Sequence, residues 1–141
     1  MALASAQVVD AVAALLLPMG ATGGRVYTSR TWPLAEASLP AWRVTAGGER
    51  VEQLALDGSL QQHTLQVDAT CIARATADLD DTLHNLAAAG LTLLFAAPPN
   101  ALQLDAIERE LSAEGEAAVG RIRLSMTALF QTAPGAPETI L

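Results

Sequence analysis

The chain has 141 residues, a formal net charge of −7 and 51% hydrophobic residues. This length suits one domain with a substantial buried core, and no apolar run reaches the ~18 residues of a membrane-spanning helix. All eight basic residues are arginines, and the acidic balance excludes direct recognition of nucleic acid, which requires a basic surface.

The sequence contains one cysteine, Cys71. It excludes an intramolecular disulfide and favours a reducing compartment. The apolar stretch Val8–Leu17 contains Asp10 and lacks a basic leader, so we expect neither a signal peptide nor a membrane partner. The expected place of synthesis is the cytoplasm.

The first expected element is a helix over Ala6–Leu17. Its apolar residues recur at helical spacing at Val8, Val9, Val12, Leu15 and Leu16. Ser5 is the expected N-cap, and Pro18 and Gly20 end the helix. We expect Gly20–Gly24 to form a flexible loop.

Two strands are expected next. Val26-Tyr27 start a short edge strand, and Ala41–Ala46 form a longer strand that ends at Gly47-Gly48. The polar segment that follows closes at Asp57-Gly58, a sequence typical of a hairpin turn.

The clearest strand of the sequence follows this turn. Over Thr64–Ala73, apolar and polar residues alternate with a period of two, which predicts one buried and one exposed face. Asp78 is the expected cap of the next helix. That helix keeps its apolar residues at helical spacing over Leu79–Phe95 and stops at Pro98-Pro99.

Two more strands complete the pattern. Leu102–Leu111 is expected to be a strand, although Glu108-Arg109-Glu110 tolerates a helix as well. Gly115 makes a turn, and Ile122–Phe130 again alternate between apolar and polar residues. Residues 131–141 contain two prolines and a glycine, and we expect them to form a flexible tail.

These elements predict an α+β fold. We expect an antiparallel or mixed sheet of about four or five strands, with two main helices packed on one face. One domain covers residues 1–130, and residues 131–141 form the flexible C-terminal tail.

The stretch Arg25–Val44 concentrates the residue types that stabilise protein–protein contacts. It contains both tryptophans, the one tyrosine, three of the eight arginines and two of the seven prolines. Large aromatics and arginines carry much of the binding energy of interfaces. We therefore expect Arg25, Arg30, Trp32 and Pro33 to contribute to an interface, with a lid over the core as the rival role of Trp32.

A second interface candidate is the acidic stretch 105–116, in which Arg109 is the one basic residue. We expect Glu108 and Glu110 to face an arginine-bearing surface of a neighbouring copy, such as one containing Arg25 or Arg30, where complementary charge sets register. The alternative is an acidic strand and turn that faces water.

Three groups of residues were considered as a metal site, a phosphate-binding loop and a catalytic nucleophile, and none has the full pattern that such a site requires. Asp80 and His84 lie one helical turn apart, but two ligands are too few for a tight metal site. The Gly20–Arg25 loop follows a helix, whereas phosphate-binding loops follow a strand. Cys71, like Trp42, falls in a strand where a core position is expected. We therefore expect no catalysis, no cofactor and no bound metal.

One sequence pattern and the order of the elements resemble a known family. A short helix leads to Val26-Tyr27-x-x-Arg30-x-x-Pro33-Leu34 and then to Leu39-Pro40-Ala41 at the entry of a strand. A polar excursion, a long strand, a central helix and a final strand follow. This order, over Ala4–Phe130, is similar to that of the small tail terminator (tail completion) proteins of long-tailed bacteriophages, including the lambda-like ones.

The resemblance implies a structural virion protein without chemistry of its own. Family members form hexameric rings that cap the tail tube, stop its polymerisation and present a surface to the head–tail connector. The implied partners are further copies of the chain, the tail tube protein and the connector protein. The implied location is the head-proximal end of the tail, and the host cytoplasm during assembly.

Two alternatives stay open. One is another head–tail neck or joining protein. The other, from a different class, is a small cytoplasmic binding or enzyme domain that uses the Gly20–Arg25 loop and the helix at Asp78.

Overall fold

The structure is a computed structural model of the chain. It describes residues 3–28, 40–74, 79–96, 101–114 and 117–141, with the backbone alone for 111–114 and 117–118. The described elements are α1 (Ala4–Leu16), a 3-10 turn η1 (Gly20–Thr22), β1 (Val26–Thr28), β2 (Ala41–Gln53), β3 (Gln61–Arg74), α2 (Leu79–Ala96), β4 (Ala101–Glu114) and β5 (Ala117–Thr132).

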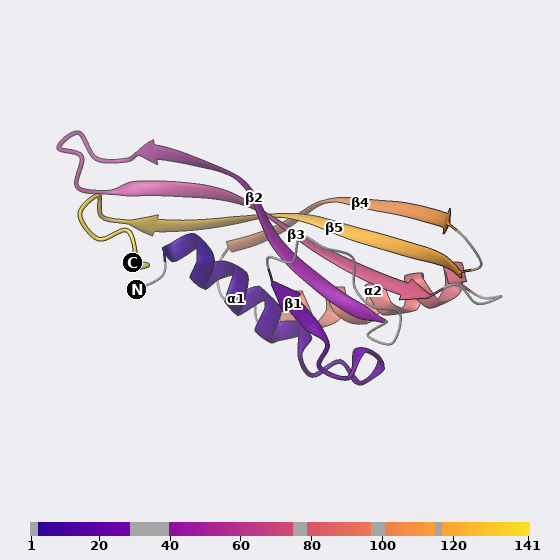
Figure 1. Cartoon of the computed structure of the whole chain (residues 1–141). Coiled ribbons are helices and arrows are strands. Elements are labelled where there is room, and N and C mark those ends of the chain that lie inside the picture. Colours follow the sequence, from indigo (N-terminus) through magenta and orange to yellow (C-terminus); the bar gives the residue numbers. More distant parts are fainter. Residues whose placement is uncertain (1–2, 29–39, 75–78, 97–100, 115–116) are drawn as a thin grey trace.

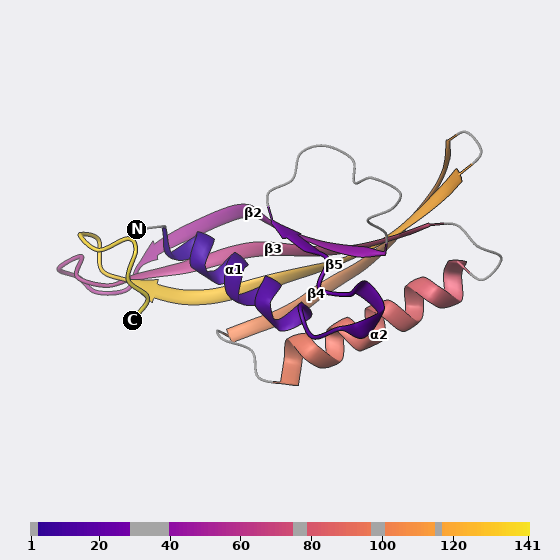
Figure 2. The same cartoon turned by 60° about the horizontal axis from the view of Figure 1, so that its bottom comes forward.

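One five-stranded sheet runs through the described part of the chain, in the order β1-β2-β3-β5-β4. β1 is parallel to β2, and all other neighbours are antiparallel. Both helices lie on the same face of this sheet (Figures 1 and 2). The predicted α+β class, with a mixed sheet and two helices on one face, is confirmed.

The core fills the space between this face and the helices. The alternation in β3 and β5 turns their apolar residues inward, and eight of them are at most 1% exposed: Leu65, Val67, Ala69, Cys71, Ile122, Leu124, Met126 and Ala128. Burial of these side chains is the main source of folding free energy for a sheet covered on one side.

Trp42, at the start of β2, packs against α2. Its side chain is fully buried, as predicted, and its indole N–H donates to the Sδ atom of Met19 at 3.2 Å. Gly90 of α2 lies over the ring so closely that a Cβ there would be 2.7 Å from a ring carbon. A tryptophan in this place therefore requires a glycine in the helix above it.

The start of α1 differs from the prediction. The helix begins at Ala4 with Leu3 as its N-cap and no side-chain cap, so the expected cap at Ser5 is wrong. The Ala4 N–H donates to the carbonyl oxygen of Pro137 at 3.0 Å. The C-terminal segment thus accepts one of the N–H groups that a helix start leaves unpaired, and a distant partner of this kind leaves no local sequence signal.

Gly47-Gly48 form a bulge and do not end the strand. The register of β2 against β3 shifts between Ala46 and Glu49, and β2 continues to Gln53. A Cβ on the first of these glycines would lie 3.2 Å from the side chain of Gln66 on β3. The predicted end of the strand is wrong, because glycine here permits a close passage of two paired strands.

Several other predicted elements are confirmed. β1 is a short edge strand, and β4 is a strand rather than a helix at the opposite edge. Gly58 has a φ of 75° in the expected hairpin turn. The predicted cap at Asp78, the stop at Pro98-Pro99 and the turn at Gly115 lie outside the described residues. Among the described helices, none is both long and apolar enough to cross a membrane.

The C-terminal segment folds back onto α1, and Figure 1 shows both termini at the same end of the molecule. The Leu141 N–H donates to the carbonyl oxygen of Gln131 at 2.9 Å. The side-chain amide of Gln7 donates to the carbonyl oxygen of Glu138 at 2.6 Å, and Ile140 packs against the core. Flexibility of this tail stays a prediction.

Candidate protein interface

The face of the sheet opposite the helices carries rows of charged residues, which we call the charged face. Its residues alternate with the buried Trp42, Cys71 and Ile122 and therefore point away from the core. The strand registers align Arg43, Thr70, Arg123 and Glu108 in one row and Arg121 and Glu110 in the next. These six residues and Arg109 line a depression of about 370 Å³.

Acids and arginines of the charged face stand opposite each other on β4 and β5. Glu108 forms an ion pair with Arg123, and Glu110 is the register partner of Arg121. The two paired side chains are 57% and 45% exposed. At this exposure an ion pair contributes roughly 0–1 kcal/mol to the stability of the fold. The charge pattern is therefore better suited to recognition of a charged partner than to stabilisation of the monomer.

The predicted interface residues Glu108 and Glu110 are thus on the charged face. They lie beside Arg123 and Arg121, which the sequence prediction did not include. The prediction expected Arg25 or Arg30 of another copy, whereas Glu108 has a partner within its own chain. The sequence shows the same spacing of two for the acids at 108 and 110 and for the arginines at 121 and 123, but their pairing depends on β4 and β5 being neighbours in the sheet. Contact with a neighbouring copy stays a prediction.

Arg25 lies directly before β1. Its Nε donates to the carbonyl oxygen of Pro40 at 3.0 Å, and its own carbonyl oxygen accepts from the Trp42 N–H at 2.9 Å. These bonds join the entry of β1 to the entry of β2. Arg25 therefore stabilises the start of the sheet, and its predicted role in an interface is an additional one that stays a prediction.

The other predicted residues of this interface, Arg30, Trp32 and Pro33, lie outside the described residues. The strands on either side of their segment are paired, with Thr28 opposite Val44. Both roles of Trp32, as an interface anchor and as a lid over the core, remain predictions.

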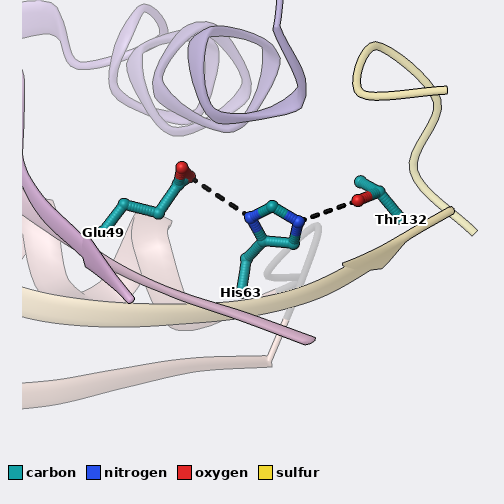
Figure 3. A network of polar contacts seen from close by, with 3 residues as sticks. All are labelled: Glu49, His63 and Thr132. Carbon is teal, nitrogen blue, oxygen red and sulfur yellow. Dashed lines mark hydrogen bonds and ion pairs between the residues drawn. The ribbon is translucent and has the colours of Figure 1, made fainter. Parts of the chain in front are cut away.

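A polar network of Glu49, His63 and Thr132 joins three strands (Figure 3). His63 Nε2 lies 2.8 Å from the Thr132 hydroxyl oxygen, and His63 Nδ1 lies 3.7 Å from a carboxylate oxygen of Glu49. The imidazole stacks on Phe130 with 4.7 Å between ring centroids. The sequence offered one clue to this site, since His63 is two residues before the inward-facing Leu65 of the same strand.

The order carboxylate, imidazole, hydroxyl is the order that hydrolases use to activate a nucleophile. Here Thr132 is 1% exposed, so a substrate carbonyl has no path to its hydroxyl. The 3.7 Å between Glu49 and His63 is also longer than a hydrogen bond. The arrangement supports a structural role, in which the imidazole of His63 and the hydroxyl of Thr132, at the end of β5, satisfy each other.

Asp80 and His84, the pair considered for a metal, are in the first turns of α2. The Nε of Arg109 on β4 donates to His84 Nε2 at 3.0 Å. This bond uses the imidazole lone pair that a metal ion at Nε2 needs. In the part of the chain that the structure describes, no three His, Cys, Asp or Glu side chains gather in a way that could hold a metal.

Cys71 has the core position that was predicted for it. The residue is fully buried, and desolvation raises the pKa of its thiol to about 12. Nucleophilic chemistry at cysteine requires the thiolate, and this environment keeps the proton on sulfur at neutral pH.

The glycine-rich Gly20–Arg25 loop contains η1. Thr22 is fully buried, and its hydroxyl donates to the carbonyl oxygen of Met19 at 3.3 Å. Gly23 and Gly24 have φ of 57° and 76°, which reverse the chain between α1 and β1. The loop leads from a helix into a strand, the opposite order from a phosphate-binding loop.

The sequence was compared with protein-family models and with curated proteins. A scan against protein-family models found no match, and a search of curated proteins found none either. The function therefore has to be inferred from the residues of this chain and from their arrangement.

Proposed function

We propose that this chain is a structural protein of a long-tailed phage, a tail terminator that closes the end of the tail tube as a ring. The element order over Ala4–Phe130 supports the proposal through its resemblance to that family. The observation that carries it is the charged face, where β2, β4 and β5 present arginines or glutamates. This face lies on the side of the sheet opposite the two helices (Figure 2).

The proposed mechanism is geometric. A closed ring requires a heterologous interface, in which one patch of a copy meets a different patch of the next copy. One side of the ring matches the last ring of the tail tube. The other side lacks the contacts that add further tube protein, so polymerisation stops there and the head–tail connector binds.

The charged face orients the neighbouring subunit in this mechanism. Exposed ion pairs such as Glu108–Arg123 exchange partners at little cost, because they contribute roughly 0–1 kcal/mol within the monomer. Complementary charge fixes register and excludes wrong orientations more than it raises affinity. Ring formation should accordingly weaken as salt concentration rises.

Polymerisation of the matching tail tube protein tests the proposal. We expect substoichiometric amounts of the chain to shorten the tubes, because each ring removes one growing end. The control is the double variant Glu108→Arg/Glu110→Arg, which should fold normally and shorten the tubes less. Tubes of unchanged length in the presence of the wild-type chain would contradict the proposal.

The same experiment separates the alternatives. Another neck or joining protein should bind finished tube ends without shortening the tubes. A small binding or enzyme domain should neither bind the tubes nor change their length.

A further inference from the structure

The sheet has two open edges, which we call the β2 edge (residues 45–53) and the β4 edge (residues 101–114). β1 pairs with β2 only as far as Val44, while β2 continues to Gln53. Among the described strands, none pairs with the β2 edge on its outer side and none lies beyond β4. Figure 1 shows β1 beside the first part of β2 alone. An open edge presents backbone N–H and C=O groups to which a further strand can bind.

Each edge carries an exposed apolar residue among charged ones. Val51 of the β2 edge is 47% exposed, and Ile107 of the β4 edge is 37% exposed. The charged residues around them are exposed as well: Glu49, Arg50 and Glu52 on β2, and Glu108 and Arg109 on β4. Single exposed apolar residues are common, so the meaning of these two depends on whether the edges fit each other.

The side chains of both edges point to defined sides of the sheet. Arg50 and Glu108 pair with outward-facing residues of β3 and β5, so both point to the charged face. Val51 and Ile107 are their neighbours in sequence and point to the side of the helices. A strand that joins the two sheets has to keep these sides, because a shift of one residue turns every side chain over.

The direction of the strands determines how the edges of two copies can meet. Three antiparallel pairings in succession, β2–β3, β3–β5 and β5–β4, make β4 antiparallel to β2. Rotation about an axis parallel to the strands leaves the direction of every strand unchanged. In a ring built in this way, the β4 edge of one copy therefore meets the β2 edge of the next in antiparallel orientation. The two edges differ, so the contact is heterologous, as a ring requires.

One antiparallel register matches the residues of the two edges on both sides of the sheet. It places Glu49 opposite Arg109, Arg50 opposite Glu108, Val51 opposite Ile107, and Glu52 opposite Ala106. Each charged pair then has opposite signs, one pair on each side of the sheet, and the two exposed apolar side chains cover each other. Pairs of both kinds stabilise antiparallel strands when they lie directly across from each other.

Other pairings of these edges bring unfavourable neighbours together. A shift of two residues that keeps the sides of the sheet puts Glu52 opposite Glu108 and Val51 opposite Arg109. Pairing of two β4 edges about a two-fold axis at Glu108 puts this carboxylate opposite its own copy. Like charges directly opposite each other destabilise a strand pair.

The contacts that the charged residues make within the chain allow such a neighbour. Arg50 lies 3.5 Å from Glu52, with side chains 79% and 57% exposed, and Glu108 pairs with Arg123. Ion pairs this exposed contribute little to stability and exchange easily. Arg109 donates its Nε N–H to His84, which uses one of the five N–H donors of the guanidinium.

We infer that the β4 edge of one copy adds to the β2 edge of the next copy as an antiparallel strand in this register. The partner is a second copy of this chain. The sheets of successive copies then form one continuous sheet, with their charged faces side by side. The inference rests on the proposed function for the closure of this sheet into a ring, and it names the contact between neighbours.

Oxidation of two cysteine variants of the full chain in one mixture tests this contact. Val51→Cys and Ile107→Cys in equal amounts should give a covalent dimer with a disulfide between positions 51 and 107, which mass spectrometry of its peptides identifies. Each variant alone should stay monomeric, because the native Cys71 is fully buried and does not take part. A mixture without this cross-link would overturn the inference.

Two controls test the register and the orientation. Arg109→Cys, used in place of Ile107→Cys, should cross-link much less to Val51→Cys, because position 109 is diagonal to position 51 in the inferred register. Equal cross-linking at positions 107 and 109 would contradict the register. Covalent dimers from Val51→Cys alone or from Ile107→Cys alone would show pairing of two like edges, which contradicts the inference.

A charge exchange gives an independent measurement. Glu108→Arg should weaken self-association in sedimentation by about fivefold or more, because it puts two arginines opposite each other. Arg50→Glu in the same chain should restore association. Within one copy β3 and β5 separate the two positions, so the rescue has to act between copies. Asp10→Arg on α1 makes the same change of charge away from both edges and should have little effect. A double variant that associates no better than Glu108→Arg alone would contradict the pairing.

These results also distinguish this inference from the proposed function. Tubes shortened by a chain that gives no cross-link between positions 51 and 107 would exclude the contact and leave the terminator proposal standing. A cross-link from a chain that never shortens tubes would support the contact and contradict the terminator proposal.

Discussion

Burial decides the chemistry of Cys71 and Thr132, which carry a thiol and a hydroxyl in the described core. Cys71 is 0% exposed and Thr132 is 1% exposed. Desolvation keeps the thiol protonated, and the hydroxyl is engaged with His63 at 2.8 Å. At the scale of the residue, the groups that resemble catalytic ones are parts of the folded core.

Cys71 should react with thiol reagents at about pH 8 only after the protein unfolds. Its pKa rises from the ordinary 9.0 to about 12 in the folded state, so the unfolded chain releases this proton first. The stabilising contribution is therefore complete below about pH 9 and is lost as the pH rises toward 12. Labelling of the native protein as fast as of the unfolded chain would contradict this.

Urea unfolding at about pH 8 and about pH 10.5 measures the same effect. Cys71→Ala is the control. Its free energy of unfolding should fall less than that of the wild type over this interval, because the titrating thiol is gone.

The His63–Thr132 bond should have a measurable effect on stability. Thr132→Val leaves His63 Nε2 without its hydroxyl partner in a mostly buried place, which should cost about 1–3 kcal/mol of unfolding free energy. Thr127→Val on the same strand is the matched control, because its hydroxyl bonds to Asp105 at the exposed surface. Equal thermal stability of the two variants would contradict the structural role of the network.

At the scale of the element, the alternation of apolar and polar residues was enough to predict the two central strands and their buried faces. Alternation located β3 and β5 and turned Cys71 inward. It could not reveal the bulge at Gly47-Gly48, because a glycine pair is equally compatible with the end of a strand. The start of α1 could not be predicted either. Its first N–H group bonds to the carbonyl oxygen of Pro137, which is distant in sequence.

The contact between α2 and β2 gives a test of element packing. Gly90→Ala places a Cβ 2.7 Å from the Trp42 ring, and such overpacking should cost about 1–3 kcal/mol. This outweighs the gain of up to about 1 kcal/mol in helix propensity. Chemical denaturation measures the difference, with Gly48→Ala as the control because a Cβ there meets nothing within 4 Å.

A second substitution makes the packing explanation specific. The atoms in conflict with the new Cβ are ring carbons of the tryptophan six-membered ring, and Trp42→Phe removes the bicyclic ring. Gly90→Ala should therefore be less costly in the Trp42→Phe background than in the wild type. Additive effects of the two substitutions would exclude a direct clash.

At the scale of the whole molecule, the order of the strands determines what the surface can do. Sequence predicted which segments are strands but not that β5 inserts between β3 and β4. That insertion aligns Glu108 with Arg123 and Glu110 with Arg121. The arginines of the charged face could not be assigned to the acids without it, because pairing depends on contacts between distant segments.

The same topology leaves the charged face on the side of the sheet opposite both helices (Figures 1 and 2). The two sides of the sheet, one covered by helices and one charged, give the chain different surfaces for successive neighbours. This is the property that a closed ring of identical copies requires, and it is the link between the fold and the proposed terminator.

Electron microscopy of tail tubes assembled in the presence of this chain tests the central proposal most directly. We predict a closed ring of the chain at one end of each tube, with six copies as the resemblance implies, and no tube protein beyond it. A single copy at the tube end, or copies bound along the length of the tube, would contradict the account.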